Sequence, residues 1–272
     1  MDKTPEQAVT IQYKGKVAII TLDIEKKLNA MNQDRYYRLA TLLNEVAARD
    51  DINITMLTGK GRFFSAGADV SISREAPPDE DVNRYWLKNF VSNNLFVTRA
   101  FYMHPKILIT ALNGPAVGLS AALIAFSDFI YAAPHAYLLT PFSSLGLVAE
   151  GGTSRAFVNR LGVSKANEAL LMSKRITAEE LLHVGFVNKI IDTGKNTDEF
   201  HSRVLAEIDD RLGAHLNGES MLKIKALIQK PERVEFDKAN VEEVFGGLER
   251  FAKGIPQEEF RKLASGEKKH KL

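Results

Sequence analysis

The chain of 272 residues contains no cysteine. That absence excludes disulfide bonds, thiolate catalysis and cysteine-containing metal sites. Long apolar runs are also missing: the longest apolar stretch, near residues 116–126, is too short to cross a bilayer. The first residues contain no apolar segment of the kind that a signal peptide requires. We therefore expect neither a membrane span nor a secretory leader.

Neither sign of charge dominates. The 36 Lys and Arg residues nearly balance the 34 Asp and Glu residues, which leaves a formal net charge of +2. No basic stripe with interleaved aromatic residues occurs, so the sequence predicts no nucleic-acid partner. The histidines show no metal-ligand spacing, and we expect no metal. They are His104, His135, His183, His201, His215 and His270.

Apolar periodicity predicts an α/β core followed by a helical region. An apolar content of 45% and a length of 272 residues are enough for a large buried core. Expected strands cover residues 9–13, 16–22, 53–57, 107–112, 129–133, 137–139 and 186–191. Expected helices cover residues 32–49, 83–103 and 119–126, and a helical pattern continues beyond residue 196. The strands recur without an obvious sequence repeat.

Two glycine-rich turns are the most informative feature. Residues 65–69 read Ser-Ala-Gly-Ala-Asp, and residues 113–120 read Asn-Gly-Pro-Ala-Val-Gly-Leu-Ser. Each follows an apolar, strand-like run and precedes a helix-like stretch. Glycine lets a backbone approach a ligand closely, and the free N–H groups at a helix start favour negative charge. Two such turns, placed side by side, are suited to binding one oxyanion without any side chain.

These turns carry a resemblance to a known family. Residues 61–69 resemble the oxyanion-hole signature of the crotonase (enoyl-CoA hydratase/isomerase) superfamily, and residues 113–119 resemble its second half. Further matches lie at residues 28–31, 128–132, 145–147 and 151–153. The resemblance implies the crotonase fold, a spiral of ββα units, with a helical C-terminal region that builds trimers. It predicts a core with the CoA site over residues 1–195 and a helical extension over residues 196–272.

The superfamily shares a way of holding a CoA thioester and not one reaction. Its hydratases use two glutamates, at positions that match Ala122 and Phe142 here, and neither residue can transfer a proton. A carboxylate occurs instead at Glu150, which resembles the single base of Δ3,Δ2-enoyl-CoA isomerases, particularly the fungal peroxisomal kind. A glutamate before Gly-Gly is by itself usually a turn residue that caps a helix. Leu147, Val148 and Ala149 precede it, and we expect them to line an apolar pocket that raises its pKa.

The resemblance implies a specific set of site residues. Glu150 is the expected base, and the backbone N–H groups of Ala68 and Leu119 are the expected oxyanion donors. Asn94 matches an asparagine near the base in some fungal isomerases that would hold Glu150 or a water, although an asparagine on a helix face is usually solvated. The expected substrate-binding residues are Ala66, Gly67, Ala68, Asp69, Val70 and Leu119. Asp69 is otherwise expected to cap a helix, and Asp128 to make structural hydrogen bonds.

The predicted activity is therefore conversion of 3-enoyl-CoA into trans-2-enoyl-CoA in fatty-acid β-oxidation. No cofactor is expected, because CoA is part of the substrate, and the expected assembly is a homotrimer or hexamer. Residues His270, Lys271 and Leu272 resemble a variant of the Ser-Lys-Leu address, which predicts a peroxisomal import receptor as partner and the peroxisome as location. A solvated basic tail is the plain alternative. Other reactions of the superfamily, such as dienoyl-CoA isomerisation or thioester hydrolysis, stay open, as does a non-catalytic acyl-CoA-binding scaffold.

Overall fold

The structure is a computed structural model that describes residues 2–69 and 75–268. A six-stranded sheet in the order β1-β2-β3-β4-β6-β9 organises the chain. β1 pairs antiparallel with β2, and every later pair in this sheet is parallel. The strands are β1 (Val9–Lys14), β2 (Val17–Leu22), β3 (Ile54–Gly59), β4 (Ile107–Leu112), β6 (Phe129–Ala132) and β9 (Lys189–Ile190). A smaller sheet contains β5 (Ala116–Val117), β7 (Tyr137–Leu139) and β8 (Ile176–Thr177).

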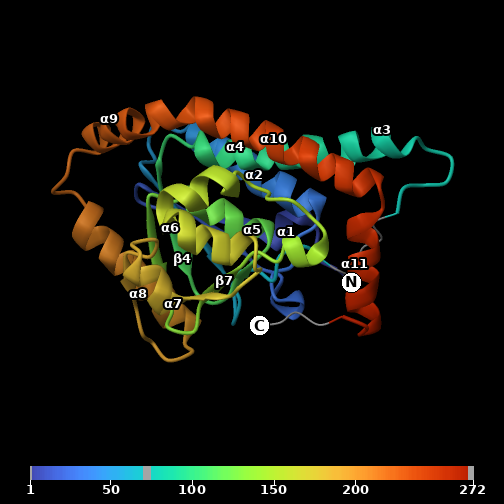
Figure 1. The fold of residues 1–272 in the computed structure, drawn as a ribbon. Helices are drawn as coiled ribbons and strands as arrows, with labels where there is room; N and C mark the ends of the chain where they lie inside the picture. Colours follow the sequence, from blue (N-terminus) through green and yellow to red (C-terminus); the bar gives the residue numbers. More distant parts are fainter. Residues whose placement is uncertain (1, 70–74, 269–272) are drawn as a thin grey trace.

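Helices cover both faces of the large sheet. They are α1 (Pro5–Ala8), α2 (Gln33–Ala47), α3 (Val82–Trp86), α4 (Ser92–Tyr102), α5 (Leu119–Leu123), α6 (Thr153–Leu170), α7 (Ala178–His183), α8 (Thr197–Leu212), α9 (Gly218–Gln229), α10 (Arg233–Ala252) and α11 (Ile255–Ser265). Short 3-10 or π segments are η1 (Glu25–Lys27), η2 (Leu87–Val91), η3 (Ile124–Phe126), η4 (Ser143–Leu145) and η5 (Lys230–Glu232). In Figure 1, α10 runs along the top over α4, and α11 turns down beside it. Within the described residues, no helix combines the length and apolar character that a bilayer span requires.

Period-two alternation explains why the sheet is covered on both sides. In β4, Leu108 and Leu112 belong to the core under α2, α4 and α5, whereas Ile107 and Ile109 belong to a second core under α8. Successive strand side chains point to opposite faces, so one apolar strand supplies both cores. Phe200 on α8 packs on the second core. Full burial of such side chains contributes roughly 1.5–3 kcal/mol each.

The expected α/β fold with a helical C-terminal region is confirmed. The hairpin and the strands β3, β4, β6 and β7 lie where the pattern predicted them. The long helix expected over residues 83–103 is α3, a π turn and α4 in succession. The strand expected over residues 186–191 is wrong in extent: only Lys189 and Ile190 pair with β6, while Phe186 and Val187 are buried as core side chains before the strand begins. An apolar run thus indicated burial and not strand pairing.

A buried histidine makes the stability of the folded protein depend on pH. His104, 1% exposed, lies 2.7 Å from the Thr55 hydroxyl through its Nε2, and burial lowers the pKa of its ring to about 3. The unfolded chain gains a proton on this ring as the pH falls below about 6.5, whereas the folded chain stays neutral until the pH nears the lower value. The stability that the neutral ring contributes is therefore lost as the pH falls from about 6.5.

We predict that this residue destabilises the protein by about 2 kcal/mol at pH 5 relative to pH 7. Urea unfolding at both pH values, for the wild type and His104→Gln, measures this contribution as the difference between their pH dependences. His104→Gln removes the titrating ring, so its stability should fall less between pH 7 and pH 5. Identical pH dependence in the two proteins would contradict the assignment.

Candidate active site

The two glycine turns lie against each other. A Cβ at Gly67 would lie only 2.8 Å from the Val117 carbonyl oxygen, and φ at Gly67 is +84°. The Val117 N–H donates to the Ser65 carbonyl at 2.9 Å, which joins the turns directly. Gly118, with φ of +61°, is the N-cap residue that joins the second turn to α5. The side-by-side arrangement that the sequence predicted is therefore present, and only glycine fits at Gly67.

The backbone N–H groups of Ala68 and Leu119 are both available to bind one ligand atom. Leu119 is the first residue of α5, so its N–H has no carbonyl in a preceding helical turn. Ala68 lies beside Met31, whose hydrogen bonds join it to Gly67 and Asp69 instead. Within residues 2–69 and 75–268, neither the Ala68 nor the Leu119 N–H donates a hydrogen bond. Both residues line one cavity, and a pair of such donors is what a developing oxyanion needs.

A buried chain of hydroxyl groups holds the two turns in place. The Tyr36 hydroxyl lies 2.9 Å from Ser120 Oγ, which lies 2.9 Å from Ser65 Oγ. Ser65 Oγ also donates to the Asn29 carbonyl at 2.8 Å and accepts from the Gly67 N–H at 3.1 Å. The chain joins one turn to the helix that follows the other. Ser65 and Ser120 were not expected as supporting residues, although both stand inside the two motifs.

Glu150 lies in the same cavity and is 8% exposed. It directly precedes the Gly151–Gly152 turn from which α6 begins. Asn94 on α4 donates from Nδ2 to Glu150 Oε2 at 3.3 Å, so the structure brings these two predicted residues together. Burial raises the pKa of the Tyr36 hydroxyl, and the negative charge of Glu150 raises it further. Tyr36 is therefore a neutral hydroxyl near the carboxylate.

The turn that carries Glu150 packs directly on the helix that carries Leu119. A Cβ at Gly151 would lie 2.8 Å from Ala122 Cβ and 2.9 Å from Leu119 Cδ1. Ala122 is fully buried in that contact. A longer side chain at position 122 would collide with the turn, so the place of one hydratase glutamate is filled by close packing.

The cavity has a volume of about 400 Å³ and is bounded mainly by apolar side chains. The expectation for residues 147–149 is only partly met, since Leu147 lines the cavity and the next two residues do not. Most apolar lining comes from distant segments: Trp86, Phe90, Val97, Phe142, Leu145, Phe251, Phe260 and Leu263. Sequence reasoning missed the aromatic residues, because nothing local to the turns indicates which remote helices cover them. The lining spans both sides of the predicted boundary at residue 195, and that boundary stays a prediction.

Other predicted residues have different surroundings. The Asp69 carboxylate pairs with Lys27 Nζ at 2.9 Å, and an Arg35 nitrogen lies 3.8 Å away. Its expected role as a helix cap stays a prediction, because Val70 lies outside the described residues, as do residues 270–272. Asp128 accepts from the Leu108 N–H at 2.7 Å and from Lys225 Nζ at 2.6 Å, which confirms its structural role. Ala66 lines the cavity as expected.

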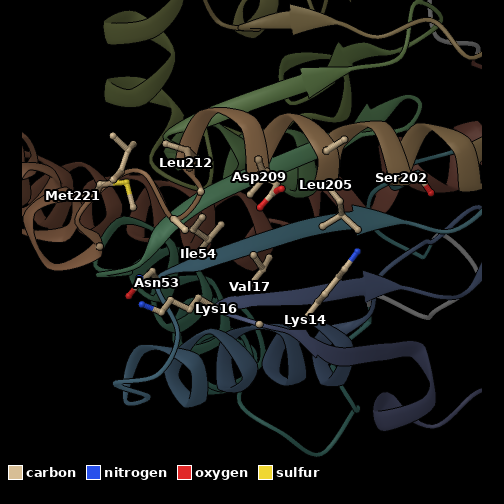
Figure 2. Close-up of a pocket in the computed structure, with 17 residues that line it drawn as sticks. Lys14, Lys16, Val17, Asn53, Ile54, Ser202, Leu205, Asp209, Leu212 and Met221 are labelled. Atoms are coloured by element: carbon tan, nitrogen blue, oxygen red, sulfur yellow. The ribbon is translucent and has the colours of Figure 1, made fainter.

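A second cavity, of about 720 Å³, lies between the β1–β2 turn and the segment joining α8 to α9. Figure 2 shows Lys14 and Lys16 on one side of it and Asp209 with Leu205 on the facing helix. Asp209, an exposed residue, is the one carboxylate among its described lining residues. The larger volume therefore lacks a buried carboxylate beside open amides. The smaller cavity is therefore the candidate active site. The described residues contain no cluster of three His, Asp or Glu side chains able to hold a metal ion.

Comparison with known proteins shows the family to which the chain belongs. The sequence matches the enoyl-CoA hydratase/isomerase family over residues 12–262. It is 58% identical, over 97% of this chain and 98% of the relative, to the Delta(3,5)-Delta(2,4)-dienoyl-CoA isomerase of Pyricularia oryzae. It is 36% identical to the 3,2-trans-enoyl-CoA isomerase of Saccharomyces cerevisiae, over 98% of this chain and 97% of the relative. The crystal structure of an enoyl-CoA hydratase/isomerase from Pseudoalteromonas atlantica T6c shares the fold, with a TM-score of 0.81 at 22% identity, over 97% of this chain and all of that one.

The packing of Gly151 generates a stability prediction with a matched control. Gly151 and Gly254 have similar φ, +69° and +71°, and Gly254 is left-handed, but a Cβ at Gly254 would meet nothing within 4 Å. Gly254→Ala should cost about 1–2 kcal/mol for the left-handed backbone alone. Gly151→Ala should cost a further 1–3 kcal/mol or so from overpacking against α5. Urea unfolding of both variants measures the difference, and equal destabilisation would show that the turn does not pack as described.

Proposed function

Because the chain belongs to the enoyl-CoA hydratase/isomerase family, we propose that it is an enoyl-CoA isomerase that converts 3-enoyl-CoA into trans-2-enoyl-CoA. The observation that carries the proposal is the position of one buried carboxylate, Glu150, in the same cavity as the open amides of Ala68 and Leu119. An acyl-CoA thioester places an acidic C2 proton beside a carbonyl oxygen. The cavity therefore offers a base for the proton and two donors for the oxygen.

The proposed reaction is a proton transfer within one bound substrate. The Glu150 carboxylate removes a proton from C2, and the resulting charge spreads over a dienolate that ends at the thioester oxygen. The N–H groups of Ala68 and Leu119 stabilise that oxygen. The protonated Glu150 then returns the proton to C4, which leaves the double bond between C2 and C3. Atoms and electrons balance without an added reagent, so we propose that no cofactor takes part.

The surroundings of Glu150 support a base that acts alone. Ala122 and Phe142 are both buried, and neither carries a proton-transferring group. Asn94 contacts the carboxylate through its amide, which orients Glu150 without competing for the proton. A well-placed general base contributes roughly 10²–10⁴-fold, and an oxyanion donor on the order of 10²–10³-fold. The two effects together give a substantial rate without a second acid.

The Pyricularia relative favours a second candidate, conversion of a 3,5-dienoyl-CoA into a 2,4-dienoyl-CoA. That reaction also begins at C2 but returns a proton to C6, two carbons beyond C4. A second acidic group farther along the cavity would serve it. Besides Glu150, the described lining residues include only two carboxylates, Asp34 and Asp69; Asp34 is exposed and Asp69 pairs with Lys27. This arrangement favours the shorter transfer.

Replacement of the base tests the proposal. Glu150→Gln keeps the size of the side chain and removes the proton acceptor, so isomerisation of 3-enoyl-CoA should fall by about 10²–10⁴-fold. Absorbance of the conjugated thioester follows the reaction, and circular dichroism checks the fold. Asp209→Asn is the control in the second cavity and should retain wild-type turnover.

The same assay compares substrates. The wild type should turn over 3-enoyl-CoA faster than 3,5-dienoyl-CoA and should hydrate 2-enoyl-CoA weakly. A folded Glu150→Gln protein with normal turnover would refute the proposed base. A far higher kcat/KM for the dienoyl substrate would establish the second candidate instead, and no turnover of any of them would favour a non-catalytic acyl-CoA-binding protein.

We also propose a peroxisomal location and a trimeric or hexameric assembly. A mouse relative, 30% identical over 93% of this chain, is named enoyl-CoA delta isomerase 3, peroxisomal. Exposed apolar side chains on α9 and at the start of α10 support self-association: Ile224, Leu227, Ile228 and Val234. An N-terminally tagged protein should enter peroxisomes and lose that location when residues 270–272 are removed. A cytosolic full-length protein would contradict the proposed location. A monomeric mass in light scattering would contradict the proposed assembly.

A further inference from the structure

One face of α10 contacts the loop that carries Glu150. Arg250 Nε donates to the Gly146 carbonyl at 2.8 Å. One turn earlier, Gly246 lies close to Val148: a Cβ at Gly246 would be 3.3 Å from Val148 Cγ2. Glu243, a turn earlier again, reaches the end of the same loop. Residues at these spacings share a helix face, so α10 supports the loop along its length (Figure 1).

Glu243 makes the most specific of these contacts. Its Oε2 accepts from the Gly152 N–H at 2.6 Å, and its Oε1 accepts from the Ser154 N–H at 2.8 Å. The side chain is 6% exposed. Gly152 is the N-cap of α6 and has no side chain with which to bond the first amides of that helix. A carboxylate from α10 thus occupies the place of a local capping residue.

The placement of this carboxylate needs an explanation beyond helix capping. Burial raises the pKa of Glu243, which shows that the charged form has a desolvation cost, although both amide bonds act in the opposite direction. A serine or aspartate at position 152 is the usual cap, but Gly152 has a φ of +73° and packs against Phe126, with 2.7 Å between its would-be Cβ and the ring. The turn therefore excludes a local cap and receives one from outside.

We propose that Glu243 is a positioning residue for Glu150, because it fixes the turn that follows the base and occupies the Gly152 and Ser154 amides of that turn. The inference rests on the proposed function of Glu150 as the base. Thr153 holds the same turn from within, since its Oγ1 donates to the Glu150 carbonyl at 2.8 Å. With the backbone held at both places, the Glu150 side chain lies in the cavity and contacts Asn94.

Loss of Glu243 would change what Glu150 bonds to. The Gly152 and Ser154 amides would lose their acceptor at a helix start, where negative charge is favoured. Glu150, two residues before Gly152, is a carboxylate in the same turn and would be drawn toward those amides. A carboxylate that accepts backbone N–H bonds is stabilised as an anion and is a weaker base. Occupation by Glu243 keeps the base directed at the substrate.

Steady-state kinetics of the full-length protein tests this role. Glu243→Ala should lower kcat for 3-enoyl-CoA on the order of 10²-fold, because small displacements of a reacting group have effects of that size. KM should change less than about threefold, since Glu243 does not line the cavity. Glu243→Gln keeps one acceptor oxygen for two amides and should recover part of kcat. This partial rescue is not expected of a residue that only stabilises the fold.

Tyr102→Phe is the matched control. Tyr102 on α4 donates to Asp237 on α10, so the substitution weakens the attachment of α10 without touching the loop that carries Glu150. It should lower the melting temperature and leave kcat unchanged. A folded Glu243→Ala protein with wild-type kcat, or a loss no larger than that of Tyr102→Phe, would overturn the inference. If Glu243→Ala does not fold, wild-type kcat in Glu243→Gln would overturn it equally. An inactive wild type would refute the proposed function instead.

Discussion

The site depends on the close approach of two backbones at Gly67 and Val117. A side chain at Gly67 would collide with a carbonyl, so the approach requires glycine and brings the two turns into hydrogen-bonding contact. The parallel order β2-β3-β4 places the segments that lead into these turns side by side. Two open amides then line one cavity without any catalytic side chain between them. The remaining requirement of the candidate site is the position of one carboxylate relative to those amides.

The carboxylate is placed by packing against the same helix. Gly151 packs on Ala122 and Leu119, so the turn that carries Glu150, the proposed base, is positioned relative to Leu119, a proposed oxyanion donor, by a glycine–alanine contact in the core. The C-terminal helix α10 then holds the outer side of that turn through Glu243. The helical extension is therefore part of the frame of the candidate site. A buried carboxylate in the frame is costly, and its two amide bonds offset that cost.

Much of this was predictable from the sequence, for physical reasons. Glycine turns after apolar strands are local features, so the two turns were predicted from the residues beside them, and the family resemblance then placed the expected oxyanion donors at Ala68 and Leu119. Glu150 was predicted as the base from its resemblance to the single glutamate of Δ3,Δ2-enoyl-CoA isomerases, supported by the absence of carboxylates at positions 122 and 142. Glu243 and Phe251 were not found, because their roles depend on how α10 crosses α4, and helix periodicity gives a face without giving its partner. The strand expected over residues 186–191 failed similarly, since apolar burial alone does not specify pairing.

The central claim is that one buried carboxylate both removes and returns the proton. Deuterium tracing tests it most directly: 3-enoyl-CoA dideuterated at C2 is converted in ordinary water, and the product is analysed at C4 after a single turnover. A buried Glu150 that exchanges slowly with solvent should deliver a substantial part of the deuterium to C4 of the trans-2-enoyl product. Only solvent hydrogen at C4 would contradict direct return of the abstracted proton by Glu150.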